Sequence, residues 1–172
     1  MKNIGVIIGS VREGRVGIKV AKWIMEKAKD EENNYNIIDL MDFNLPHYNE
    51  PFGPRSGKEY KYEATRNWSN EIKKYDGFIF VTPEYNGYIT GALKDAIDFL
   101  YFEWKEKPFG IVGYGGQGAK WASEGLSLLL KRFDMTDMGS VHIHKPWDSV
   151  DKDNNIMKDY IEGDILELFT KF

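Results

Sequence analysis

The chain has 172 residues, of which 42% are hydrophobic and 29% charged, and its formal net charge is -4. This length is typical of one domain with a substantial core, so we expect residues 1–172 to fold as a single domain. The acidic balance and the lack of a basic tract predict no nucleic-acid partner and no membrane partner. The sequence contains no cysteine. Disulfides, thiolate metal sites and cysteine nucleophiles are therefore excluded, and any redox chemistry must come from a cofactor.

The first apolar run covers residues 4–8. It is too short for the core of a signal peptide or for a membrane span. We therefore expect a cytoplasmic protein.

Short apolar runs rich in β-branched and aromatic residues predict five strands, at residues 4–8, 37–40, 78–81, 109–112 and 141–144. Segments with helical spacing of apolar residues lie between and after them, at residues 17–29, 57–74, 91–102, 119–133 and 156–172. This alternation predicts an α/β fold with a doubly wound parallel sheet and helices on both faces. Five strands favour the order 2-1-3-4-5 over the six-stranded dinucleotide-binding arrangement.

The proline-rich segment 44–54 predicts a long loop after the second strand. Long loops inside a compact domain are often functional. Two interpretations are open for this loop, a structural connector and a lid or interface.

The turn after the first strand, residues 9–17, is rich in glycine and leads into a helix. Ligands of doubly wound sheets bind at the carboxyl ends of the strands, and free N–H groups at a helix N-terminus attract anions there. Ser10, Arg12 and Arg15 add a hydroxyl and two guanidinium groups, which predicts a phosphate site. The turn lacks the lysine of a Walker loop and the G-x-G-x-x-G fingerprint, which disfavours a triphosphatase and a dinucleotide site. An ordinary turn with solvated arginines is the alternative.

Two further loops follow the third and fourth strands. Residues 82–91 contain many turn formers together with Tyr85 and Tyr88, and their backbone could hold a planar heteroaromatic ring. Thr90 in this loop is interpreted as the N-cap of the next helix. Residues 113–119 are glycine-rich, which permits a close approach of the backbone to a ligand. The three loops together predict a mononucleotide cofactor.

Three motifs resemble those of the NADPH-dependent FMN reductase family: Gly9-Ser10-x-Arg12-x-Gly14-Arg15-x-Gly17, Pro83-Glu84-Tyr85-Asn86-Gly87 and Leu93-Lys94-x-Ala96-Ile97-Asp98. That family includes quinone, azo-dye and chromate reductases. The resemblance implies a flavodoxin-like fold, FMN bound without a covalent bond, and a homodimer or homotetramer. We interpret the third motif mainly as helix packing and local ion pairing.

The resemblance also implies which residues bind FMN. The phosphate would be held by Ser10, Arg12, Arg15, Val16 and Gly17. The isoalloxazine ring would lie along Pro83, Glu84, Tyr85 and Asn86, with its other edge at Gly113, Tyr114, Gly115 and Gly116. The sequence departs from the usual double glycine at Gly118-Ala119, which could alter contacts to the ring.

The activity implied by the resemblance is that of an FMN-dependent NAD(P)H oxidoreductase. NADPH or NADH would donate hydride, and a quinone, free flavin, azo compound or metal oxyanion would accept the electrons. The flavin performs this chemistry, so no catalytic side chain is assigned. A non-enzymatic FMN-binding electron carrier and a redox-sensing flavoprotein are the alternatives. Arg12 and Arg15 disfavour the carrier, because the phosphate loops of flavodoxins are rich in threonine.

Two further groups of residues invite interpretation. His142 and His144 share one face of the fifth strand, with Asp148 nearby, but two histidines without a clear third ligand predict no metal site. The aromatic residues Tyr101, Phe102 and Trp104 could form an oligomer contact or belong to the core.

Overall fold

A computed structural model describes residues 1–149, 151 and 155–172 of the chain. A single sheet has the strand order β2-β1-β3-β4-β5-β6. Its strands are β1 (Asn3–Ile8), β2 (Asn34–Asp39), β3 (Gly77–Pro83), β4 (Pro108–Gly115), β5 (Thr136–His144) and β6 (Ile161–Glu162). The first five strands are parallel, and β6 runs antiparallel to β5. The predicted flavodoxin-like order 2-1-3-4-5 is confirmed, with a sixth strand added at its edge.

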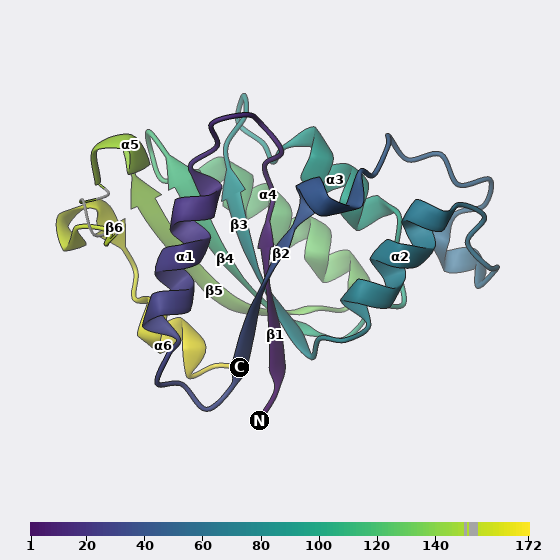
Figure 1. The fold of residues 1–172 in the computed structure, drawn as a ribbon, viewed down its shortest axis with the longest axis horizontal. Helices are drawn as coiled ribbons and strands as arrows, with labels where there is room; N and C mark the ends of the chain where they lie inside the picture. Colours follow the sequence, from purple (N-terminus) through teal and green to yellow (C-terminus); the bar gives the residue numbers. More distant parts are fainter. Residues whose placement is uncertain (150, 152–154) are drawn as a thin grey trace.

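Helices cover both faces of this sheet. They are α1 (Gly17–Lys27), α2 (Glu63–Ile72), α3 (Gly91–Asp98), α4 (Lys120–Leu130), α5 (Pro146–Ser149) and α6 (Ile165–Phe169). One core cluster joins the sheet to α1 and α6, and the other joins it to α2, α3 and α4. Figure 1 shows α1 in front of the sheet and α4 behind it. Among the described residues, no helix has the length and apolar character needed to cross a membrane.

The central strand β3 is apolar because helices cover the sheet on both faces. Every residue of β3 is buried, as expected for a parallel strand covered on both faces. Phe78 and Phe80 point to the face that holds Trp104, whereas Ile79 and Val81 point to the face of α1. The ring centroids of Trp104 and Phe78 lie 5.0 Å apart. Trp104 is fully buried and belongs to the core, so it is not an oligomer contact, whereas Phe102 is 55% exposed.

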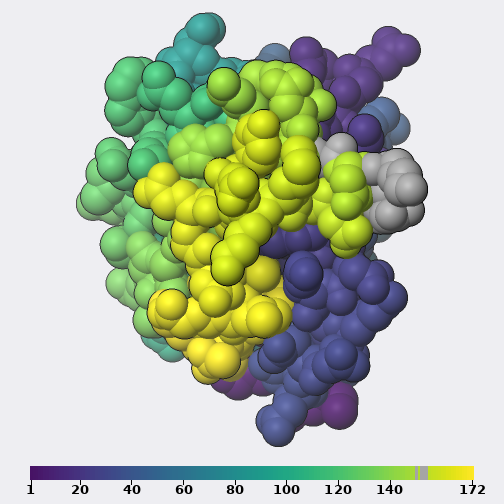
Figure 2. All heavy atoms as spheres, turned by 90° about the vertical axis from the view of Figure 1, so that its left-hand side faces the viewer, coloured from purple at the N-terminus to yellow at the C-terminus, as the bar shows by residue number. Residues whose placement is uncertain are grey.

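The helix predicted at 91–102 ends at Asp98, and two other predicted helices differ more from the structure. The helix expected at 57–74 starts at Glu63, because Gly57 adopts a positive φ of 68° and ends a short 3-10 turn. The helix expected at 156–172 is wrong over its first half. That half holds a 3-10 turn (Lys158–Tyr160) and β6, and Asp164 then caps α6 by accepting from the N–H of Leu166. Figure 2 shows this C-terminal segment, in yellow, covering one side of the molecule.

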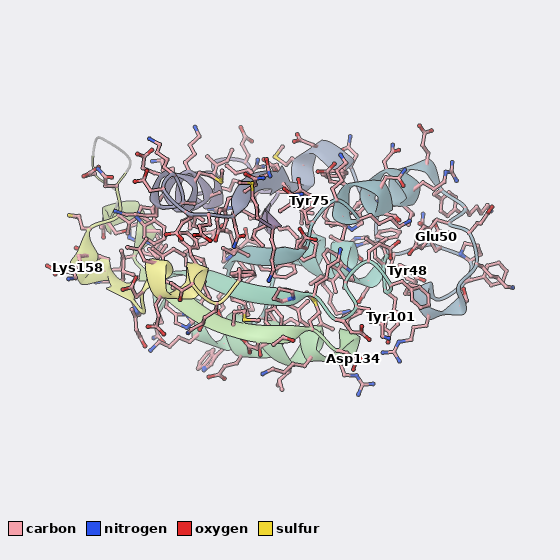
Figure 3. The ribbon with its side chains drawn as sticks, turned by 90° about the horizontal axis from the view of Figure 1, so that it is seen from below. Tyr48, Glu50, Tyr75, Tyr101, Asp134 and Lys158 are labelled. Carbon is pink, nitrogen blue, oxygen red and sulfur yellow. The ribbon has the colours of Figure 1, made fainter. Side chains whose placement is uncertain are left out.

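The loop 44–54 is tied down at several points. The Asp95 carboxylate on α3 accepts from the N–H of Tyr48 at 3.1 Å and contacts His47 at 2.8 Å. The Glu50 carboxylate accepts from the N–H groups of Lys61 and Tyr62, at 2.9 and 3.1 Å. Figure 3 places Tyr48 and Glu50 at the opposite end of the molecule from Lys158. These contacts favour the structural connector.

Candidate functional site

The carboxyl ends of β1, β3 and β4 lie at the top of the molecule as drawn in Figure 1, and the loops that follow them meet there. They enclose a pocket of ≈ 300 Å³ lined by Ser10, Arg12, Arg15, Val16, Pro83, Glu84, Tyr85, Tyr114, Gly115, Gly116, Pro146 and Trp147. All the predicted site residues line it except Gly17, Asn86 and Gly113. Larger hollows lie beside α2 and along α4 and β5. The switch point of the strand order nevertheless favours the smaller pocket.

The two arginines of the first loop have different surroundings. The Arg15 guanidinium forms an ion pair with Asp39 at the end of β2, and its side chain is only 9% exposed. Its Nε is buried with no partner among the described residues. Arg12 is exposed at the mouth of the pocket. Arg12 thus presents a positive charge with no ion pair among residues 1–149, 151 and 155–172, whereas the charge of Arg15 is already balanced by Asp39.

A hydrogen bond joins the first loop to the second. The hydroxyls of Ser10 and Tyr85 lie 3.1 Å apart, and the N–H of Arg12 points to the same Ser10 oxygen at 3.4 Å. Ser10 is buried, whereas Tyr85 is 41% exposed. This contact joins the turn 9–17, the predicted phosphate site, to the loop 82–91, the predicted site of the ring.

The second loop is a tight hairpin. Tyr85 and Tyr88 exchange backbone hydrogen bonds of 2.9 and 3.2 Å, and Asn86 and Gly87 between them have φ values of 52° and 79°. Positive φ at both central residues is typical of the two-residue turn that Asn-Gly favours. Asn86 is therefore used to make the turn, which explains why it does not line the pocket. The Asn86-Gly87 pair in the sequence is itself a pattern that predicts such a hairpin turn.

Two side chains of the second loop cap helices. The Glu84 carboxylate accepts from the N–H of Ala122, in the first turn of α4, at 3.1 Å. Thr90 accepts from the N–H of Leu93 at 3.0 Å and donates to the carbonyl of Gly9. The predicted N-cap role of Thr90 is confirmed. The Glu84 carboxylate is therefore engaged with α4, while the residue also lines the pocket.

The glycines of the site fall into two groups. A Cβ on Gly17 would lie 2.7 Å from the Tyr114 hydroxyl, and one on Gly113 would lie 2.6 Å from the Gly118 carbonyl. Glycine is required at these two positions because other atoms of the protein occupy the space that a side chain would need. By contrast, a Cβ on Gly115 or Gly116 would meet nothing closer than 3.8 Å and 4.0 Å. Packing within the chain does not demand glycine there, so their bare backbone leaves room for a ligand.

Tyr114 lies beneath the N-terminus of α1. Its hydroxyl packs against Gly17, where an added Cβ would lie 2.7 Å from it, and its side chain is buried. Burial, with Tyr85 as the next cause, raises the pKa of Tyr114 above its usual range. The hydroxyl therefore keeps its proton at neutral pH and is available as a neutral donor.

The motif after Thr90 has the packing role expected of it. Leu93, Ala96 and Ile97 are buried in the core, and Lys94 pairs with Asp98 one turn along α3.

The histidines of β5 are engaged within the protein. The Nδ1 of His142 lies 2.8 Å from the Gly118 carbonyl, and the Nε2 of His144 lies 3.2 Å from the Glu162 carboxylate. Across the described part of the chain, no three histidine or carboxylate side chains are grouped so as to hold a metal ion.

Sequence reasoning missed three residues of the site. Asp39 orients Arg15, and Pro146 and Trp147 line the pocket from the segment after β5. Because β5 neighbours β4, its carboxyl end also reaches the pocket. The rule that ligands bind at the carboxyl ends of strands could therefore have found Trp147.

The fold and the pocket define the class of protein: a doubly wound α/β fold with a pocket at its switch point that is lined by arginine, glycine and aromatic residues. Residues 2–148 match the family model described as NADPH-dependent FMN reductase. An NAD(P)H-dependent FMN reductase of Nectria sp. is 43% identical over 141 residues, which cover 76% of this chain and 70% of that protein. A quinone reductase of Pseudomonas putida is 33% identical over 130 residues, 70% of this chain and 66% of that protein.

The fold is also similar to that of a solved structure. The flavoenzyme NAD(P)H:(acceptor) oxidoreductase FerB from Paracoccus denitrificans superposes with a TM-score of 0.68 at 24% identity, covering 92% of this chain and 88% of that one. The chain belongs to the NADPH-dependent FMN reductase family. It is a flavin-dependent oxidoreductase that uses FMN with NAD(P)H as electron donor and passes electrons to small acceptors.

The residues present fit FMN. The unpartnered Nε of Arg15 and the exposed Arg12 suit a phosphate at one end of the pocket. The open floor at Gly115 and Gly116 and the aromatic side chain of Tyr85 suit a planar ring at the other.

Proposed function

We propose that FMN binds in the pocket at the ends of β1, β3 and β4, and that NADPH or NADH and a small acceptor visit it in turn. The observation that carries this proposal is the convergence of three loops on one pocket with a cationic end and a glycine floor. Residues 1–172 would form one domain around it. We also propose a cytoplasmic location, where reduced nicotinamide nucleotides are available.

The phosphate end of the proposed site uses the turn after β1. Arg12 donates from the open side, and Arg15, held by Asp39, completes the cradle at Ser10. The first N–H groups of α1, an 11-residue helix, add the positive end of its dipole. In this proposal Val16 contacts the phosphate through its backbone, and Gly17 allows Tyr114 to approach the helix N-terminus.

The ring end uses backbone more than side chains. Pro83, Glu84 and Tyr85 would follow one edge of the ring, and Gly115 and Gly116 the other. Asn86 and Gly113 would act by shaping these loops, because one makes the hairpin turn and the other packs against Gly118.

When bound, FMN supplies the acceptance of hydride from the nicotinamide and the delivery of electrons to the acceptor. The chain holds and orients the partners of that exchange. We assign no acid or base among its side chains. The acceptors we propose are quinones, free flavins, azo compounds and metal oxyanions. A single pocket shared by donor and acceptor predicts that the oxidised nucleotide leaves before the acceptor enters.

We also propose that the protein assembles as a homodimer or homotetramer through α4. Trp121, Gly125 and Leu128 lie along one side of this helix at helical spacing, and Tyr88 packs over Gly125. Trp121 is 65% exposed and Leu128 70% exposed. Large apolar groups gathered at a surface often mark an interface. A second copy on this face would lie beside the hairpin that carries Tyr85.

The test is the visible absorption spectrum of the purified protein, followed by anaerobic addition of NADPH and then of a quinone. Flavin bands that bleach with NADPH and return with the quinone are the expected result. Bands that persist after NADPH would point to a carrier or a sensor. A protein that shows no flavin bands and binds no added FMN would overturn the proposed site.

A further inference from the structure

Trp147 lines the pocket from a segment outside the three predicted loops. It is the second residue of α5, which follows β5, and it lines the pocket with Gly115 and Gly116. The strand order β1-β3-β4-β5 means that the pocket runs across the ends of four neighbouring strands. Trp147 therefore borders the pocket next to the glycine loop that follows β4.

The backbone that carries Trp147 is held in place. The N–H of Lys145 donates to the Gly115 carbonyl at 2.8 Å, which joins this segment to the glycine loop. Lys145 has a φ of 44°, a left-handed conformation that persists in non-glycine residues only where the surroundings enforce it. Pro146 and Ser149 on either side of the tryptophan are buried. The fold thus defines the backbone position of Trp147.

Trp147 is one of two exposed tryptophans, and of these two it alone lines the pocket. Trp23, Trp68 and Trp104 are at most 2% exposed, whereas Trp147 is 61% exposed. A Cβ placed on Gly116 would be 4.0 Å from the tip of the indole, so the ring stands over the bare glycine floor. Together with Tyr85, it gives the pocket exposed aromatic side chains from two different loops.

We propose that Trp147 lies against the bound flavin and is a binding residue of the site, shielding the ring from water on the side of Gly116. This inference rests on the proposed FMN site and adds a residue from outside the three family motifs. An aromatic ring against a planar heterocycle gains dispersion and stacking energy, and it covers apolar surface. Because the backbone that carries Trp147 is already held, this segment loses little backbone entropy when the ligand binds.

The experiment strips the protein of flavin, titrates it with FMN and follows the flavin emission. Indole quenches flavin emission when the two rings touch. We expect the bound FMN of Trp147→Phe to be severalfold brighter than that of the unchanged protein. Phe52→Leu is the control, because Phe52 is an exposed aromatic side chain that does not line the pocket. It should leave the emission unchanged.

A second variant measures affinity. Trp147→Ala should bind FMN about tenfold more weakly, the size expected for losing one aromatic contact. Urea unfolding of the apo protein checks that the variant is folded. Equal affinity and equal emission in the Trp147 variants would overturn the inference while leaving the proposed FMN site standing. Weaker binding without brighter emission would also overturn it, because the indole would then act only through the loop. Failure of the unchanged protein to bind FMN would overturn both proposals.

Discussion

Arg12 and Arg15 both reach the pocket, yet their charges are not equally available. Asp39 neutralises Arg15, while Arg12 faces the solvent side of the same turn. The motif alone gives the two arginines equal weight, because the ion pair depends on Asp39, which stands 24 residues from Arg15. We therefore expect Arg12 to supply most of the net electrostatic attraction for a phosphate. Arg15, which is paired with Asp39, would mainly form part of the pocket wall.

Arg12→Ala should weaken FMN binding by roughly tenfold to a hundredfold, the range for a hydrogen bond to a charged group. The dependence of affinity on salt should fall as well, since the lost charge is exposed. Isothermal titration of the apo protein at two salt concentrations measures both effects. Arg132→Ala, which changes an exposed arginine outside the pocket, is the control. If both variants bind alike, Arg12 is not a phosphate ligand.

At the scale of elements, the hairpin after β3 depends on helix α4. The ring of Tyr88 occupies the space above Gly125, where an added Cβ would come within 2.3 Å of it. Glu84 from the same loop caps the first turn of α4. The hairpin and the helix therefore pack as one unit, and we expect a change on the helix at Gly125 to be felt by Tyr88.

A double-mutant cycle tests this coupling. Glycine inside a helix normally costs about 1 kcal/mol relative to alanine, so Gly125→Ala should stabilise the protein when Tyr88 is first replaced by alanine. In the unchanged background the added methyl should displace Tyr88, and the gain should vanish or change sign. Urea unfolding of the four proteins gives the coupling energy. Additive effects would show that Tyr88 moves aside freely.

At the scale of the whole molecule, the apolar face of α4 is the feature that a monomer leaves unexplained. Its exposed Trp121 and Leu128 are continuous with Tyr88 and so with the loop that borders the pocket. Assembly through this face would link oligomeric state to flavin binding.

Leu128→Glu should lower the solution mass, because a buried carboxylate without a partner strongly disfavours an interface. Light scattering coupled to gel filtration measures it. Leu166→Glu on α6, where Leu166 is 48% exposed, serves as the matched control and should keep the native mass. An unchanged mass for the Leu128→Glu protein would show that α4 does not form the interface.

Local patterns in the sequence were enough to predict the strands, most of the helices and the loops that form the pocket. The alternation of apolar runs and helical segments predicted the strand order, because strand and helix periodicity are properties of neighbouring residues. The loops after β1, β3 and β4 were found in the same way, and most of their predicted residues meet in one pocket. The role of Thr90 followed from its position just before a helix.

Only the tertiary structure decided the rest, because those features depend on residues far apart in the chain. The 57–74 and 156–172 segments satisfy helical spacing, but backbone turns at Gly57 and Gly163 shorten both helices. Trp104 looks like Trp147 in the sequence, yet one is buried under the sheet and the other stands beside the pocket. The burial of a side chain depends on residues that are distant in the sequence, so a local sequence pattern does not determine it.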